Sequence, residues 1–162
     1  MNYCLSVSTK DGEFIAGYSA TGLAQLSFPE ARTTRPSVLP DLPPKIRAWH
    51  RQTIAAVKAV LSGCRPSTLP PFDLSSGTAF QQDVWRALSQ IKLGHTQSYG
   101  EVASAIGRPK AVRAVGSACG ANPIPLLIPC HRVLAAHQRL GGFGGGLDWK
   151  RKLLAAEKVH FF

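Results

Sequence analysis

The chain has 162 residues, of which 44% are hydrophobic, so it can bury the core of one ordinary domain or two small ones. It holds no apolar run long enough to cross a membrane and does not begin like a signal peptide. We therefore expect a cytoplasmic protein without a membrane partner. The net charge is +10, with +7 in residues 76–162, which favours a polyanionic partner over a basic surface that only maintains solubility.

Three short segments near the N-terminus have strand character. Residues 3–8 alternate between apolar and polar side chains, and residues 14–18 and 23–28 are apolar segments between turn signals. Together they predict an antiparallel meander. Residues 29–44 are rich in proline and lack any periodicity, which predicts a connector.

A helix is predicted at about residues 45–61, because apolar side chains recur on one face and Gly63 suits the position after a helix end. This face would cover the sheet. His50 has no cysteine or carboxylate nearby in the sequence, so we interpret it as structural. Residues 1–72 are interpreted as a small scaffold domain, with residues 65–71 as a stiff linker.

Residues 76–162 are predicted to form a second, mostly helical domain, which gives an α+β fold overall. A capping box of Thr78 and Gln81 begins its first helix. Two more helices are predicted at residues 99–106 and 110–120, separated by a short turn that contains a glycine. This arrangement resembles a helix-turn-helix, a motif that binds DNA.

The exposed side of the helix predicted at residues 110–120 carries small side chains and one arginine. Gly116, Ser117 and Gly120 would allow a close approach to a DNA backbone. Arg113 could project into a groove or into the base stack. The composition favours DNA contact, but a small helix packed inside the domain stays an alternative.

The last part of the chain combines a flexible loop with a helix that ends on a carboxylate. Residues 141–146 are five glycines and Phe143, a composition that lets backbone approach a ligand closely. Glu157 lies near the end of a helix predicted at residues 148–158, where the helix dipole disfavours an anion. A partner such as a histidine could hold it there, although a solvated pair with a lysine is an alternative.

A cysteine followed by two basic residues lies in the apolar segment Ile128-Pro129-Cys130-His131-Arg132-Val133. A cysteine nucleophile reacts as a thiolate, which a nearby histidine or positive charge favours. His131 could act on Cys130 through one bridging water, and Glu157 could orient His131. A buried structural cysteine is the alternative. The four cysteines include no C-x-x-C pair, so no metal site is expected.

These motifs resemble the O6-alkylguanine-DNA alkyltransferase family, also called methylated-DNA–protein-cysteine methyltransferases. The resemblance covers residues 78–157, and Pro129-Cys130-His131-Arg132 is its most specific element. The other matching elements are Phe80-Gln81, Val84-Trp85, Ser98-Tyr99-Gly100, Arg113-Ala114-Val115-Gly116, Asn122-Pro123, Gly145-Gly146-Leu147 and Leu153-Leu154 with Glu157.

The resemblance implies a monomer that binds double-stranded DNA through the minor groove and needs no cofactor. Cys130 would accept the alkyl group of O6-alkylguanine, or less well of O4-alkylthymine, once per molecule after the base is flipped out. His131 would be the base, Glu157 would orient it, and Asn122 would support the site. DNA contacts would come from Tyr99, which rotates the phosphate, from Arg113, which replaces the flipped nucleotide, and from Ala114, Gly116 and Ser117. The substrate pocket would comprise Tyr99, Phe143, Gly144 and Val133, whose carbonyl would accept from the guanine amino group.

Three positions depart from the family pattern: Phe143 replaces the usual tyrosine, Gly144 replaces a serine of some members, and Lys92 replaces a frequent proline.

A lesion-binding protein without transfer is the main alternative, but such relatives carry another residue in place of Cys130. A cysteine hydrolase is a third interpretation, disfavoured by the basic charge. The motif assigns no role to Arg132, and we expect structural bonding to nearby carbonyls.

Overall fold

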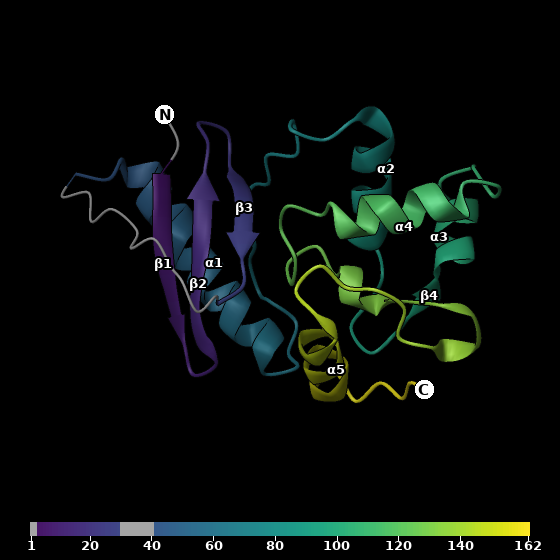
Figure 1. Cartoon of the computed structure of the whole chain (residues 1–162). Coiled ribbons are helices and arrows are strands. Elements are labelled where there is room, and N and C mark those ends of the chain that lie inside the picture. The colour runs from purple at the N-terminus through teal and green to yellow at the C-terminus, as the bar shows by residue number, and fades with distance from the viewer. Residues whose placement is uncertain (1–2, 30–40) are drawn as a thin grey trace.

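The computed structural model describes residues 3–29 and 41–162, and it has the α+β fold expected from the sequence. An antiparallel sheet contains, in this order, β1 (Tyr3–Thr9), β2 (Gly12–Tyr18) and β3 (Leu23–Ser27). Helix α1 (Pro44–Leu61) lies against one face of the sheet, and the other helices form a second part beside β3 (Figure 1). The connector expected at residues 29–44 falls largely outside the described residues.

The sheet buries one set of alternating side chains, as its sequence pattern predicts. Val7 of β1 lies opposite Phe14 of β2, and both are fully buried. Tyr18 is also buried, and its hydroxyl donates to Thr53 Oγ1 of α1 at 2.8 Å. The same hydroxyl lies 3.0 Å from His50 Nδ1, in keeping with a structural role for this histidine.

The second part contains four helices: α2 (Ala79–Leu88), α3 (Tyr99–Ala105), α4 (Val112–Gly120) and α5 (Leu147–Ala156). The capping box of Thr78 and Gln81 begins α2 as predicted. Helix α4 packs against both α2 and α3. Trp85 Nε1 of α2 donates to the Ala118 carbonyl of α4 at 2.8 Å, so these two helices are joined by a buried hydrogen bond.

Some elements differ from the sequence-based prediction. Helix α4 begins at Val112 rather than near Lys110, because the Ala111 amide first closes a separate turn on the Arg108 carbonyl. The parallel pair of β4 (Gln97–Ser98) and β5 (Val133–Leu134) was not predicted. Two-residue strands are too short to show a periodic pattern, and their pairing joins segments that are distant in sequence.

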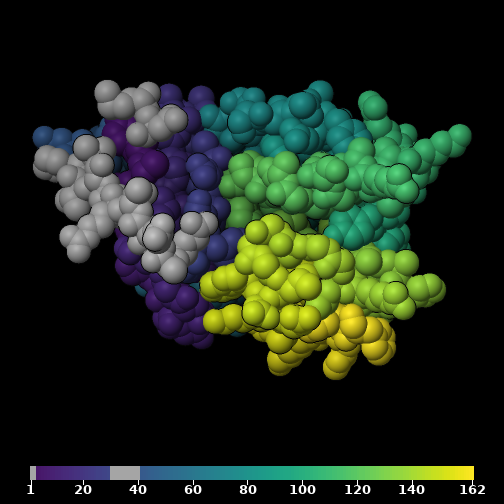
Figure 2. Space-filling view, in the orientation of Figure 1, coloured from purple at the N-terminus to yellow at the C-terminus, as the bar shows by residue number. Residues whose placement is uncertain are grey.

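The two parts are packed directly against each other. The Trp149 ring of α5 lies 5.5 Å from Phe14 and 5.1 Å from Phe28, and Lys152 Nζ lies 2.6 Å from Asp11 Oδ1. Figure 2 shows the yellow C-terminal residues in contact with the purple strands. We propose that residues 1–72 and 76–162 are two domains that share one apolar core.

The predicted linker is attached to the sheet at its end. The Leu23 amide donates to the Pro71 carbonyl and the Asp73 amide donates to the Leu23 carbonyl, each at 2.8 Å.

Among the described helices, none is long and apolar enough to cross a lipid bilayer.

Candidate functional site

Cys130 begins a short 3₁₀ helix, η1 (Cys130–Arg132), between two fully buried residues, Ile128 and Val133. The Cys130 amide donates to the Ile128 carbonyl at 2.8 Å, and Pro129 restricts the backbone between them. Four residues before Cys130, the buried Leu126 adopts a positive φ of 70°, which a branched side chain rarely does. The buried apolar residues and the restricted backbone therefore hold the Cys130 thiol in one position.

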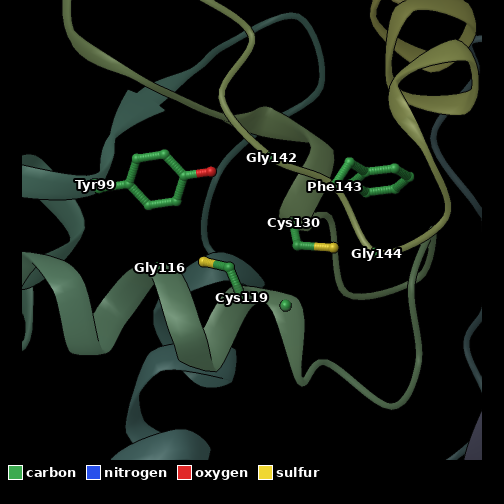
Figure 3. A pocket seen from close by; sticks show the side chains of 8 residues that line it. Tyr99, Gly116, Cys119, Cys130, Gly142, Phe143 and Gly144 are labelled. Carbon is green, nitrogen blue, oxygen red and sulfur yellow. The ribbon is translucent and has the colours of Figure 1, made fainter.

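Cys130 lines a cavity of about 350 Å³ at the junction of α3, α4 and the glycine-rich loop of residues 141–146. The residues that line it are Tyr99, Gly116, Cys119, Gly120, Cys130, Gly142, Phe143 and Gly144. Figure 3 shows the Tyr99 hydroxyl pointing into this space, with Phe143 beyond Cys130. Glycines form much of the wall, so a flat ligand could approach the backbone closely.

His131, Glu157 and Arg132 form a buried network behind Cys130. His131 Nε2 lies 2.8 Å from Glu157 Oε1. Arg132 donates to the same carboxylate from Nε, 3.0 Å from Oε2, and from Nη2, 2.9 Å from Oε1. Its Nη1 donates to the Ile91 carbonyl at 2.6 Å. Arg132 therefore bonds to one carbonyl, as expected, but its principal partner is Glu157, which the sequence analysis did not connect with it.

The pKa values in this network favour a neutral histidine beside a carboxylate. Burial would raise the pKa of Glu157, but the hydrogen bonds from His131 and Arg132 outweigh it and lower the pKa to about 2. Burial lowers the pKa of His131, although Glu157 opposes this shift. The Nε2–H of His131 therefore donates to Glu157. His131 Nδ1 is buried without a hydrogen-bond partner among the described residues, so it is free to accept a proton.

Burial also controls the thiols of the cavity. It raises the pKa of Cys130, while Asn122 and the charge of Lys150 act in the opposite direction. It raises the pKa of Cys119 to about 12. Both cysteines are thus neutral thiols in the resting protein, and only Cys130 is adjacent to a histidine that could remove its proton.

Asn122 braces the segment that leads to Cys130. Its Nδ2 donates to the Ile128 carbonyl at 2.8 Å, and its Oδ1 accepts from the Ile124 amide at 3.0 Å. These two bonds close the chain between α4 and η1 into a fixed loop. The resemblance implied a supporting role for Asn122, and these bonds are in keeping with it.

Lys150 is a residue that the sequence analysis missed. It is fully buried in α5, and its Nζ donates to the Val133 carbonyl at 2.7 Å and to the Gly142 carbonyl at 3.1 Å. Burial lowers its pKa to about 8. Lys150 lies three and four residues before Leu153 and Leu154, which places it on the inward face of the helix. This spacing is the sequence feature that could have predicted its burial.

The predicted pocket residues do not all reach the cavity. Tyr99, Phe143 and Gly144 line it. Val133 is not among the residues that line it: its side chain is fully buried, and its carbonyl accepts one hydrogen bond, from Lys150. Cys119 lines the cavity instead, although its apolar position on α4 gave no sign of this.

The predicted DNA-contacting residues lie on α4 and at the start of α3. Arg113, Ala114 and Ser117 are exposed on α4. Gly116 is half-buried, and a β-carbon there would lie 3.9 Å from the Tyr99 ring. The residues thus share one surface that adjoins the cavity.

Comparison with known proteins identifies the family. Residues 79–159 match the family model described as 6-O-methylguanine DNA methyltransferase, DNA binding domain. A methylated-DNA–protein-cysteine methyltransferase from Mycobacterium leprae is 39% identical over 158 residues, which cover 98% of this chain and 93% of the relative. The chain belongs to the O6-methylguanine-DNA methyltransferase family. The resemblance stated from the sequence is therefore confirmed.

Two further members of this methyltransferase family show how far the likeness extends. A relative of the same name from Haemophilus influenzae is 56% identical over 85 residues, so the match spans 52% of this chain and about half (48%) of the relative. The crystal structure of Mycobacterium tuberculosis OGT in complex with DNA is 37% identical, with a TM-score of 0.77, and the match covers 94% of this chain and 91% of that one. The fold likeness therefore includes both parts of the chain.

Proposed function

We propose that this chain repairs DNA by transferring the alkyl group of O6-alkylguanine irreversibly to Cys130. The single observation that carries the proposal is that Cys130 lines a glycine-walled cavity in front of the His131–Glu157 pair. The family membership supports a methyltransferase, and the DNA complex of the Mycobacterium tuberculosis relative supports DNA as the partner.

The first step is activation of the Cys130 thiol. His131 Nδ1 takes the thiol proton through one bridging water, because neighbouring side chains in η1 do not face each other. The imidazolium that forms is stabilised by the Glu157 carboxylate at 2.8 Å. The positive charge of Lys150 also favours the thiolate. Activation thus needs no cofactor or metal.

The second step is displacement at the alkyl carbon. The thiolate sulfur forms a bond with this carbon while the bond from the carbon to O6 of guanine breaks. The electron pair passes into the guanine ring, which takes up the proton held by His131 and becomes ordinary guanine. Cys130 becomes a thioether, which has no group to remove it, so each molecule reacts once.

The DNA would bind across α4 and the start of α3, which together act as a helix-turn-helix. The exposed Ala114 and Ser117 and the half-buried Gly116 leave room for the minor-groove backbone. Arg113 would fill the space of the flipped nucleotide, and Tyr99 would favour rotation of its phosphate. The net charge of +10 provides attraction to the phosphates. We propose that one cytoplasmic monomer is sufficient, with O4-alkylthymine as a poorer substrate.

A lesion-binding protein without transfer is the second candidate. It would share α4, Arg113 and the cavity, but it would have no use for a nucleophile. The presence of Cys130 with the buried pair behind it favours transfer.

Transfer of a radiolabelled methyl group from a duplex containing O6-methylguanine tests the proposal. The wild-type chain should gain one label per molecule, and Cys130→Ser should gain none. Cys64→Ser is the matched control, because Cys64 is exposed and outside the cavity. A wild-type chain that binds the duplex but gains no label would support the lesion-binding alternative.

A further inference from the structure

Helix α1 carries a strongly basic outer face on the N-terminal domain. Residues 44–72 contain five lysine or arginine residues and no aspartate or glutamate. Arg47, Arg51 and Lys58 are exposed, and their spacing places them on one face of the helix. These three cations are called the basic stripe below. The exposed side chain between Arg51 and Lys58 on this face is the small Ala55.

The charges of the basic stripe are not neutralised within the part of the chain that the structure describes. The ion pairs among residues 3–29 and 41–162 involve none of its three cations. Arg47 Nη2 donates to the Leu42 carbonyl at 3.3 Å, and this acceptor carries no net charge. The stripe therefore presents three positive charges to the solvent.

The positions of these charges are unfavourable for the helix itself. Arg47 lies in the first turn of α1, which contains no acidic residue, and the helix dipole disfavours a cation there. Arg47 and Arg51 are four residues apart, so their like charges repel each other. A surface that served only solubility would intersperse charges of both signs. The basic stripe therefore has the character of a binding surface for an external polyanion.

Duplex DNA is the polyanion that fits this face. Arg47 and Lys58 are about 16 Å apart along the helix axis, which is the length of roughly five base pairs. Because Ala55 is small, a phosphate backbone can approach the helix closely between Arg51 and Lys58. Lysine and arginine contact phosphates without reading the base sequence. Binding to the basic stripe therefore requires neither a damaged base nor a particular sequence.

The basic stripe and α4 lie on different sides of the molecule. Figure 1 shows α1 behind the sheet and α4 in front of α2. The buried face of α1 packs on β1 and β2, so its exposed face points away from the sheet. We propose that the basic stripe binds the phosphate backbone of a second duplex segment, so that one chain holds two segments of DNA at once. This binding does not involve Cys130 and does not depend on alkyl transfer.

Capture of one duplex by another tests this inference. An undamaged duplex is fixed to beads, the chain is added, and its affinity for a second, fluorescent duplex is measured over a range of salt concentrations. The wild-type chain should retain the fluorescent duplex. The double variant Arg51→Gln/Lys58→Gln should bind it more weakly, with a salt slope lower by about two, one for each lost phosphate contact. This variant should fold, because glutamine is a good helix former, and should transfer the methyl group of O6-methylguanine in a short duplex at the wild-type rate.

The double variant Lys10→Gln/Arg86→Gln is the matched control, because both residues are exposed cations outside α1. It should retain the fluorescent duplex like the wild type. Unchanged retention in the α1 variant, or no retention by the wild type, would overturn the inference. Equal losses of retention and of methyl transfer would also overturn it, because they would place α1 in the same DNA site as α4. Stronger competition by a polyglutamate peptide than by a duplex of equal charge would assign the face to an acidic protein instead. A wild-type chain that retains the duplex but transfers no methyl group would contradict the proposed function alone.

Discussion

Arg132 holds the carboxylate of Glu157 with two nitrogens, Nε at 3.0 Å from Oε2 and Nη2 at 2.9 Å from Oε1. Both side chains are almost completely buried, so the pair lies in a medium of low polarity where a lone charge is costly. The same carboxylate accepts from His131. Arg132 therefore keeps Glu157 ionised and fixes the tautomer of the base proposed to act on Cys130.

The first prediction concerns this ion pair. Arg132→Met should lower the free energy of unfolding by about 3–5 kcal/mol, because it leaves a buried carboxylate with one partner fewer. Arg132→Lys keeps the charge but loses the fork geometry, so it should cost less than Arg132→Met. Urea unfolding measures both. Equal stability of Arg132→Met and the wild type would show that the pair does not matter for the fold.

The second prediction concerns pH. The pKa of His131 is lowered in the folded chain, so the unfolded chain binds its proton more readily below the ordinary value of about 6.5. Stability should therefore fall as the pH drops below 6.5. The depressed pKa of Glu157 adds a further loss of stability only when the pH falls below about 4.5, toward the folded-state pKa of about 2. Between pH 6.5 and 4.5, His131→Gln should make the stability less dependent on pH, as measured by urea unfolding. A slope identical to that of the wild type would be evidence against a buried neutral His131.

The third prediction concerns Lys150. Lys150→Met should slow alkyl transfer, because the loss of positive charge near Cys130 disfavours the thiolate. It should also lower the free energy of unfolding by about 2 kcal/mol, because the buried Val133 carbonyl and the more exposed Gly142 carbonyl both lose a charged donor. Arg151→Met is the control, since Arg151 is exposed on the same helix and makes only a surface ion pair. Transfer at the wild-type rate in Lys150→Met would show that the charge of Lys150 does not contribute to activation of the Cys130 thiol.

The fourth prediction concerns the exposed arginine of α4. Arg113→Ala should slow repair of O6-methylguanine in a duplex more than reaction with free O6-benzylguanine, because only the duplex requires base flipping. Arg86→Ala removes an exposed charge from α2, which carries none of the predicted DNA-contacting residues, and should affect both reactions little. If Arg113→Ala slows both substrates equally, the arginine does not replace a flipped nucleotide.

The sequence predicted the elements that depend on local pattern. The strands of the meander, the capping box at Thr78 and the two helices around Gly107 follow from alternation, helical periodicity and turn residues. The Cys130 segment and Glu157 were also identified, because each breaks a local rule: a thiol followed by two bases in an apolar run, and a carboxylate at the wrong end of a helix.

The remaining features depend on contacts between distant segments, which no local pattern encodes. The bond between Arg132 and Glu157 joins residues 25 positions apart, and the pairing of β4 with β5 joins two very short strands. The entry of Cys119 into the cavity and the engagement of the Val133 carbonyl by Lys150 likewise require the packed structure. Local pattern does not show which distant residues these side chains and carbonyls contact.

The most direct test of the proposed transfer is to locate the added group. After reaction with a duplex containing O6-methylguanine, tandem mass spectrometry of the proteolysed chain should find one methyl group, on the peptide that contains Cys130 and on its sulfur. Cys119 lines the same cavity but has a pKa raised to about 12, so it should remain unmodified. A methyl group on Cys119, or on no cysteine, would contradict the assignment of Cys130 as the acceptor.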